Sequence, residues 1–194
     1  TNYGIGWEGD EGRSDVKSVC GDYPAVISFD LGHIELGDTM SLDKVPFTKI
    51  RKEILNQYKR GGMSSLSWHL RNPLTGGDSW DVSDTTVVKS ILPGGANHEK
   101  FTDWVSKVSA FINSLQTEEG VKVPVLFRPW HEHTGSWFWW GEKLCTPEEY
   151  KALWHMTVDI LRNDGVDNAL YAYSPGSEPQ DTAQYLKRYP GDEL

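Results

Sequence analysis

The hydrophobic positions of this chain form four short apolar runs, and a segment with helical periodicity follows each of them. Short, continuous apolar runs are typical of parallel strands that are covered on both faces. The four runs lie at 25–29, 63–68, 123–130 and 169–173. The helical segments lie at 43–60, 98–117, 146–163 and, with a weaker pattern, 179–188. Alternation of strands and helices predicts one α/β domain built on a parallel sheet.

Residues that favour helix ends support several of these boundaries. Thr146-Pro147 is followed by two glutamates, so a capping side chain, a proline and acidic groups stand where a helix begins. Ser14 is a candidate cap for a short helix over 13–20, and Asn97 is a candidate cap for the helix at 98. The segment 72–97 has neither an apolar strand run nor helical periodicity and is rich in Gly, Pro, Asp and Ser, so we expect a long functional loop there.

A closed barrel and an open, doubly wound sheet both fit four strand–helix units. The open sheet often binds nucleotides through a glycine-rich turn after a strand. Gly4 and Gly6 have no third glycine in register, and Gly94-Gly95 precedes a helix without the required Lys or Ser/Thr. The absence of this fingerprint favours a (β/α)8 barrel.

The third strand leads into the chemically richest segment, 123–141. It begins as an apolar strand, becomes polar from Arg128 to His133, and ends in an aromatic loop. Barrels build active sites at the carboxyl ends of their strands in this way. Strand alternation places Glu132 on the same side as Arg128 and His131 on the other side, unless a bulge at Pro129 resets the phase.

Glu132 is the candidate catalytic group of this segment. The tryptophans around it shield a carboxyl group from water and favour the protonated form, which a general acid needs. Flat indole faces also suit the apolar faces of sugar rings. The alternative is a structural carboxylate that pairs with Arg128.

Composition limits the partners. The chain has 194 residues, a net charge of −9, nine tryptophans and eight tyrosines. Nucleic acids and anionic membranes need a basic face, so we expect neither as a partner, whereas a neutral glycan is indifferent to charge. No apolar run is long enough to span a bilayer, and no signal peptide or lipid motif is visible. Cys20 and Cys145 can bridge only if their Cα atoms lie within about 7 Å, and we expect two free thiols.

Two motifs in this segment closely resemble the signature of glycoside hydrolase family 26, chiefly endo-β-1,4-mannanases. They are Phe127-Arg128-Pro129-Trp130-His131-Glu132 and Gly135-Ser136-Trp137-Phe138-Trp139-Trp140-Gly141. The resemblance implies a (β/α)8 barrel that hydrolyses β-mannan with retention, with Glu132 as acid/base at the end of the fourth barrel strand. It implies that His131 and Trp137 contact the sugar at the cleavage point.

The resemblance also adds His69, at the end of the second predicted strand, as a sugar-binding residue. The alternative for His69 is a structural role beside the loop 72–97. Arg128 is a candidate for the cleft, where it would keep a carboxylate ionised, and its alternative is a buried ion pair. Tyr173 and Ser174 end the last predicted strand and are expected near the cleft. Two further rings, Trp139 and Trp140, are expected to pack in the interior.

A metal site is the competing chemical interpretation. His131 and His133 have a two-ligand spacing, and His69 or Asp30 would add a third ligand. No acid that would orient these histidines is evident, so we expect neither a metal nor any other cofactor.

Length complicates the barrel. A complete barrel needs about 250 residues, and the four strands found here use the whole chain. By resemblance they are strands 2–5, so residues 1–194 would be a partial catalytic domain without the first strand and strands 6–8, about three-fifths of the family's domain. The nucleophilic glutamate of a retaining enzyme would then lie outside this chain, and the fragment alone would be inactive. Asp30 and Glu35 are the weaker candidates within it.

The leading hypothesis is therefore a monomeric endo-β-1,4-mannanase acting on mannan, glucomannan or galactomannan. One alternative keeps the family but changes the substrate to mixed-linkage β-glucan or β-1,3-xylan. Another is a carbohydrate-binding barrel without turnover, or an inactive fragment. Because a polymer is degraded where it occurs, we expect a secreted, periplasmic or cell-surface location.

Overall fold

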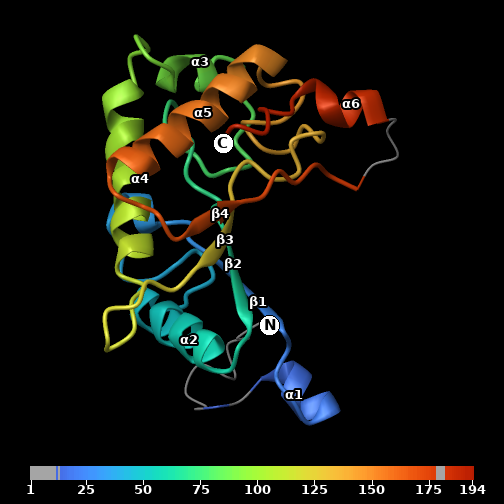
Figure 1. The fold of residues 1–194 in the computed structure, drawn as a ribbon. Coiled ribbons are helices and arrows are strands. Elements are labelled where there is room, and N and C mark those ends of the chain that lie inside the picture. Colours follow the sequence, from blue (N-terminus) through green and yellow to red (C-terminus); the bar gives the residue numbers. More distant parts are fainter. Residues whose placement is uncertain (1–11, 13, 178–181) are drawn as a thin grey trace.

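The computed structural model describes residues 12, 14–177 and 182–194. Its centre is a parallel sheet whose strands pair in the order of the sequence, β1-β2-β3-β4 (Figure 1). The strands are β1 (Val26–Asp30), β2 (Met63–Ser67), β3 (Val125–Arg128) and β4 (Ala169–Tyr171). A doubly wound sheet reverses its strand order at a switch point. The uninterrupted order therefore agrees with the predicted barrel rather than with the open sheet.

The three longest helices cover one face of this sheet. Figure 1 shows α2, α4 and α5 on the same side of the strands. The helical segments are α1 (Asp15–Cys20), the 3-10 turn η2 (Ile34–Leu36), α2 (Phe47–Lys59), α3 (Val87–Ile91), α4 (His98–Asn113), α5 (Pro147–Asn163) and α6 (Thr182–Lys187). Ile27, Leu66 and Phe127 are almost fully buried within this core. Burial of such side chains stabilises the fold by about 1.5–3 kcal/mol each.

The other face of the sheet is open in the described chain. Strand register places Val26 beside Met63, and Leu126 beside both Ser65 and Leu170. Met63 and Ser65 are two positions apart on β2, so the side chains of all these residues lie on one face of the sheet. Val26, Met63 and Leu170 are 50%, 48% and 60% exposed. The apolar runs predicted strands that are covered on both faces, whereas only one face is covered in the described chain. In a closed barrel the opposite strands cover this surface.

Several predicted boundaries are confirmed. Thr146 forms a complete capping box with Glu149 at the start of α5, and Ser14 accepts a hydrogen bond from the Lys17 backbone at the start of α1. Asn97 occupies the cap position of α4, but its side chain donates to the Ser90 hydroxyl instead of capping the helix.

Other boundaries differ from the prediction. The segment 72–97 contains the short helix α3, whose Val87, Val88 and Ile91 are buried. Helix α2 begins at Phe47 rather than at 43, because Lys44 has a left-handed φ of 60° and Pro46 precedes the helix. Helix α4 ends at Asn113, before the predicted 117.

Both cysteines are unpaired: Cys20 is exposed and Cys145 is buried. This confirms the expectation of two free thiols. No helix in the described part of the chain combines the length and the apolar character that crossing a bilayer requires.

Candidate active site

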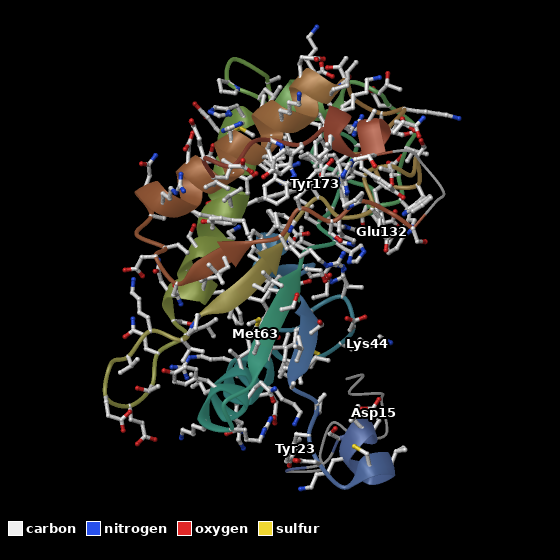
Figure 2. All side chains as sticks on the ribbon, turned by 45° about the vertical axis from the view of Figure 1, so that its right-hand side comes forward. Asp15, Tyr23, Lys44, Met63, Glu132 and Tyr173 are labelled. Atoms are coloured by element: carbon white, nitrogen blue, oxygen red, sulfur yellow. The ribbon has the colours of Figure 1, made fainter. Side chains whose placement is uncertain are left out.

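The carboxyl ends of the strands carry a polar layer on the open face of the sheet. Ser67 pairs in register with Asp30 of β1 and with Arg128 of β3, so these three side chains share one face at the end of the strands. Figure 2 shows Glu132 and Tyr173 beyond this end of the sheet. The segments that follow β1, β2, β3 and β4 therefore meet where a barrel places its active site.

The chain after β3 does not continue as a strand. β3 ends at Arg128, and both Trp130 and Glu132 have left-handed backbones, with φ of 53° and 56°. A non-glycine residue in this region costs of order 1–3 kcal/mol and persists only where its surroundings fix it. The predicted alternation through Glu132 is therefore wrong. Trp130 and His131 are both buried, and Glu132 is only partly buried.

Hydrogen bonds from three directions hold this turn. The Tyr150 hydroxyl donates to the Trp130 carbonyl, and the Trp140 indole donates to the His131 carbonyl. The Glu132 backbone N–H donates to the Ser174 carbonyl across 2.7 Å. The backbone at this turn is thus anchored to α5, to the aromatic loop and to the segment after β4, which fixes where the Glu132 side chain begins.

The Glu132 carboxylate has one orienting partner among the described residues. The indole N–H of Trp137 donates to Glu132 Oε2 across 3.0 Å, and the Trp137 ring is 38% exposed. Gly135 makes room for that ring, because a Cβ at this position would lie 2.2 Å from it. Glu132 therefore remains accessible to solvent and to a ligand, while its carboxylate has a defined direction.

Arg128 does not pair with a carboxylate in the described structure. Neither of its two predicted roles, an ion pair with Glu132 and the stabilisation of an ionised carboxylate in the cleft, is therefore seen. Its guanidinium instead donates to the Ser174 hydroxyl across 3.0 Å. Ser174 thus accepts from Arg128 through its side chain and from Glu132 through its carbonyl. The weaker prediction that Ser174 lies near the site agrees with this geometry.

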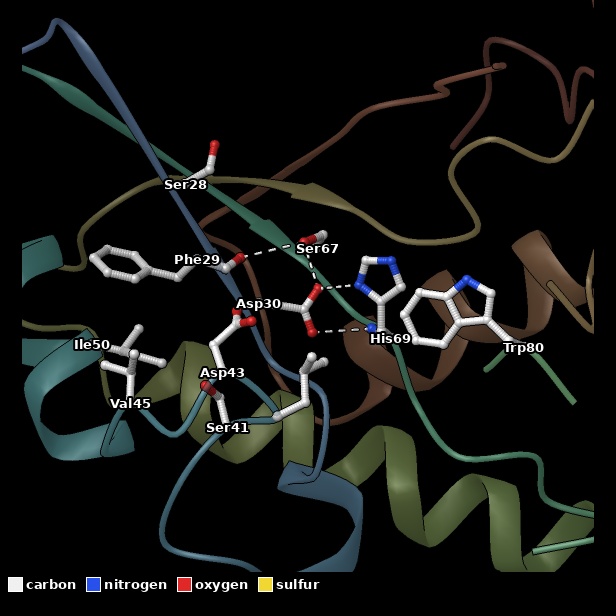
Figure 3. Close-up of a pocket in the computed structure, with 11 residues that line it drawn as sticks. Ser28, Phe29, Asp30, Ser41, Asp43, Val45, Ile50, Ser67, His69 and Trp80 are labelled. Carbon is white, nitrogen blue, oxygen red and sulfur yellow. Dashed lines mark hydrogen bonds and ion pairs between the residues drawn. The ribbon is translucent and has the colours of Figure 1, made fainter. Parts of the chain in front are cut away.

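Two histidines that follow different strands contact each other, and one of them, His131, immediately precedes Glu132 in the sequence. His69 follows β2, and its Nε2 lies 3.0 Å from Nε2 of His131. The other ring nitrogen of His69, Nδ1, lies 2.6 Å from Asp30 Oδ2 (Figure 3). Burial, followed by the charges of His69 and Arg128, lowers the pKa of His131 to about 3, so His131 is neutral at physiological pH. His69 remains partly exposed, whereas His131 is buried beneath it.

Trp80 is a component of the site that pattern analysis of the sequence missed. Its ring stacks on His69 at a centroid distance of 5.4 Å and an interplanar angle of 7°, and it is 50% exposed. Trp80 also lines a cavity of about 340 Å³ that extends along β1 past Asp30 to Asp43 (Figure 3). The sequence did contain a signal for Trp80: it is a lone tryptophan among Gly, Ser and Asp in the segment 72–97. A large aromatic residue that belongs to no helical or strand pattern is a candidate for a ligand-binding side chain.

The two other candidate carboxylates, Asp30 and Glu35, are structural in the described chain. Asp30 is 7% exposed and Glu35 is 1% exposed. Burial raises the pKa of Glu35, and its oxygens accept from the Trp68 indole and the Arg71 backbone. Neither carboxylate offers an open oxygen for attack on a sugar.

The histidines of the metal hypothesis point into different surroundings. His131 contacts His69, whereas the His133 ring lies between Tyr150 and Tyr173, with centroid distances of 4.6 and 4.7 Å. Within the described ranges, no three His, Cys, Asp or Glu side chains converge as metal ligands would.

The expected packing role of Trp139 and Trp140 agrees with their complete burial.

Parallel strands whose carboxyl ends carry the polar groups, with helices over the outer face, define the class of this protein: the chain forms part of a (β/α)8 barrel. A family model described as "Glycosyl hydrolase family 26" matches residues 5–194. The chain belongs to this family.

Related proteins agree with this assignment. The chain is 38% identical over 188 residues to a mannan endo-1,4-beta-mannosidase of Bifidobacterium adolescentis, covering 93% of this chain and 18% of that protein. It is 27% identical to a mannan endo-1,4-beta-mannosidase of Bacillus subtilis, covering 91% of this chain and 49% of that protein. The chain thus spans about half, or less, of the length of these relatives.

Solved structures show the same relationship. A GH26 beta-mannanase from Bacteroides ovatus superposes with a TM-score of 0.95 at 66% identity, covering 98% of this chain and 55% of that one. A modular endo-beta-1,4-mannanase from Cellulomonas fimi superposes with a TM-score of 0.82 at 36% identity, covering 92% of this chain and 41% of that one.

Proposed function

We propose that the protein containing this chain is an endo-β-1,4-mannanase, in which Glu132 is the general acid and base. The observation that carries the proposal is the position of Glu132. Its carboxylate is partly exposed beyond the carboxyl end of the sheet, in a family whose curated relatives are named mannan endo-1,4-beta-mannosidases. Trp137 donates to this carboxylate, and His131, which precedes Glu132 in the sequence, contacts His69.

The proposed reaction is a double displacement with retention. Glu132 would protonate the bridging oxygen as a second carboxylate attacks the anomeric carbon, and Glu132 would then deprotonate the water that releases the sugar. The two carboxyl groups of such enzymes lie about 5–5.5 Å apart. Because Asp30 and Glu35 are buried and hydrogen-bonded, we place the nucleophile on a part of the protein outside this chain.

Substitution of Glu132 tests the proposal. In the full-length protein, Glu132→Gln keeps the shape of the side chain but removes the transferable proton, so hydrolysis of mannan should fall by about 10²–10⁴-fold. An aryl mannoside with a good leaving group needs no proton for its departure, so formation of the glycosyl-enzyme should suffer less. Glu142→Gln is the matched control, because its carboxylate is exposed in the same loop. Normal mannan hydrolysis by Glu132→Gln would exclude Glu132 as the acid.

A panel of polysaccharides tests the substrate. Part of the chain is also 29% identical, over 92 residues, to a protein of Acetivibrio thermocellus named Endoglucanase H. Mixed-linkage β-glucan and β-1,3-xylan, the two alternative substrates named above, belong on the panel with mannan, glucomannan and galactomannan. Cleavage of β-glucan with mannan left intact would move the proposal to that substrate, and binding without cleavage of any polymer would indicate a carbohydrate-binding barrel.

The polymer also bears on location. Mannans are too large to cross a membrane, so we propose that the protein acts outside the cytoplasm, as a secreted, periplasmic or cell-surface enzyme. Fractionation of the source cells, with immunodetection of the protein in each fraction, tests this point.

A further inference from the structure

A pocket of about 410 Å³, here called the Arg71 pocket, lies between the 3-10 turn η2, the segment after β2 and helix α4. Three of its lining side chains are cations, Arg71, Lys100 and Lys107, although the chain carries a net charge of −9. The Arg71 pocket shares no lining residue with the cavity that extends along β1 past Asp30 and His69. Mannan is a neutral polymer, so its binding gives no reason for this concentration of positive charge.

The guanidinium of Arg71 has no partner in the described part of the chain. The backbone N–H of Arg71 donates to Glu35 Oε1 across 2.8 Å, which fixes the residue at the wall of the pocket. Its side chain is partly exposed and forms no hydrogen bond or ion pair with the described residues. The planar fork of a guanidinium matches a carboxylate through two parallel hydrogen bonds. The unpaired side chain is therefore suited to an acidic ligand.

The two lysines are held in place and keep donors for a ligand. Lys100 Nζ donates to the Pro73 carbonyl, and Lys107 Nζ donates to the Glu35 carbonyl, both across 2.8 Å. Lys107 also pairs with Asp103 across 3.0 Å. An ammonium group has three N–H donors, so donors remain on both lysines. Because the lysines are already positioned, a ligand binds without the full cost of ordering them.

The acids beside the Arg71 pocket leave it positive. Glu35 is 1% exposed, and its oxygens already accept from the Trp68 indole and the Arg71 backbone. Burial raises the pKa of Glu35, so a negative charge is disfavoured there. The side chain of Asp103 is 65% exposed, and solvent screens its pair with Lys107.

The rest of the lining suits an acidic sugar better than a bare inorganic anion. The Trp104 ring lies 4.9 Å from Lys100 Nζ, and Leu36 is 46% exposed at the pocket. These side chains place apolar surface beside the cations, as the C–H face of a pyranose ring requires. The volume of 410 Å³ falls within the range of about 300–1,000 Å³ that is typical of small-molecule sites. An inorganic oxyanion would fill only a small part of it.

From this arrangement we propose that the Arg71 pocket binds a hexuronate unit, with the carboxylate on Arg71 and Lys100 and the sugar ring beside Leu36 and Trp104. Such a site goes beyond the proposed function. It would let the protein hold an acidic glycan while the cleft at Glu132 remains open to mannan.

Titrations of the full-length protein with glucuronate, glucose and sulfate at constant ionic strength test the proposal. Glucuronate carries a carboxylate at C6 where glucose has a hydroxymethyl group, so only glucuronate should bind in the Arg71 pocket. Two hydrogen bonds to charged groups correspond to a dissociation constant of the order of 1 mM. The NMR shifts of the backbone amides at 71–76 and 100–107 report this binding.

Two variants locate the site. Arg71→Met should weaken glucuronate binding about 10–100-fold, because it removes a charged donor. Lys100→Met changes an exposed side chain and should also weaken binding, so it tests the site even if Arg71→Met fails to fold. Lys59→Met is the matched control, because Lys59 is an exposed cation on α2 that does not line the pocket. Its affinity for glucuronate should equal that of the unmodified protein.

Three results would overturn the proposal: no saturable shift with glucuronate, an equal response to glucose, or unchanged glucuronate binding in Arg71→Met or Lys100→Met. Sulfate binding as tight as that of glucuronate would overturn the sugar assignment, since the pocket would then accept any oxyanion. The titration does not use mannan hydrolysis, so failure of the proposed function would leave its outcome unaffected.

Discussion

Trp137 and Glu132 are joined by a hydrogen bond of 3.0 Å from the indole N–H to Oε2. The two residues belong to one loop, and the backbone of Glu132 is left-handed, with a φ of 56°. The ring lies over Gly135, where any larger residue would displace it. The direction of the candidate acid is therefore set by a solvent-accessible side chain rather than by the core.

Trp137→Phe should reduce activity with little effect on stability. Phe keeps an aromatic ring at this position but removes the N–H donor. A hydrogen bond to a charged group is worth about 1.5–3 kcal/mol, and about 1.4 kcal/mol corresponds to a tenfold rate change, so kcat/KM on mannan should fall roughly 10–100-fold. The free energy of unfolding should change by less than about 0.5 kcal/mol, because the ring is 38% exposed.

The double variant with Glu132→Gln provides the control for this prediction. If Trp137 acts through Glu132, Trp137→Phe should cause much less additional loss in the Glu132→Gln background, as measured by a double-mutant cycle. An equal loss in both backgrounds would mean that Trp137 acts on the sugar alone.

Arg188→Met should destabilise the fold strongly. The guanidinium of Arg188 is buried over the Tyr150 ring and donates to four backbone carbonyls of the aromatic loop. The acceptors are the carbonyls of Trp140, Gly141, Glu142 and Cys145. Removal of the guanidinium leaves these buried carbonyls without a hydrogen-bond donor. The free energy of unfolding should therefore fall by about 3 kcal/mol in a denaturant titration.

Lys187→Met is the matched control for Arg188, because Lys187 is the adjacent residue and is exposed. Its effect should stay within about 0.5 kcal/mol. Equal stability of the two variants would show that the carbonyls of the loop find other donors, and that Arg188 does not hold the loop in place.

His133→Phe should make stability less sensitive to acid. Burial, followed by the charge of Arg188, lowers the pKa of His133 to about 3, whereas the unfolded chain binds this proton near pH 6.5. The unfolded state therefore holds more protons between these pH values, and stability is lost as the pH falls through this window. His131 contributes in the same direction.

Unfolding titrations at pH 7 and pH 5 test this prediction. One buried neutral histidine costs about 1.4 kcal/mol of stability for each pH unit below 6.5. The interval from pH 6.5 to pH 5 is 1.5 units, so removing His133 should reduce the loss of stability between pH 7 and pH 5 by about 2 kcal/mol. Phe suits the site because the His133 nitrogens have no hydrogen-bond partner among the described residues and the flanking groups are tyrosine rings. An unchanged difference between the two pH values would contradict the assignment of a buried, neutral His133.

The amino-acid sequence by itself determined the framework of this protein. Apolar runs located the four strands of the described part of the chain, helical periodicity located α2, α4 and α5, and Thr146 marked the start of α5. These signals are local, because strand and helix periods and capping depend on residues a few positions apart. The motif around Glu132 likewise indicated the family from contiguous residues.

Only the tertiary structure decided how the site is arranged. The left-handed turns at Trp130 and Glu132 are stabilised by partners from α5 and from the segment after β4, so strand alternation did not predict which side chains are buried. Asp30, His69 and His131 come from three strand ends, and their hydrogen bonds depend on the register of the parallel sheet. Contacts between residues so distant in sequence leave no periodic signal, because they arise only when the strands pair and their carboxyl ends meet.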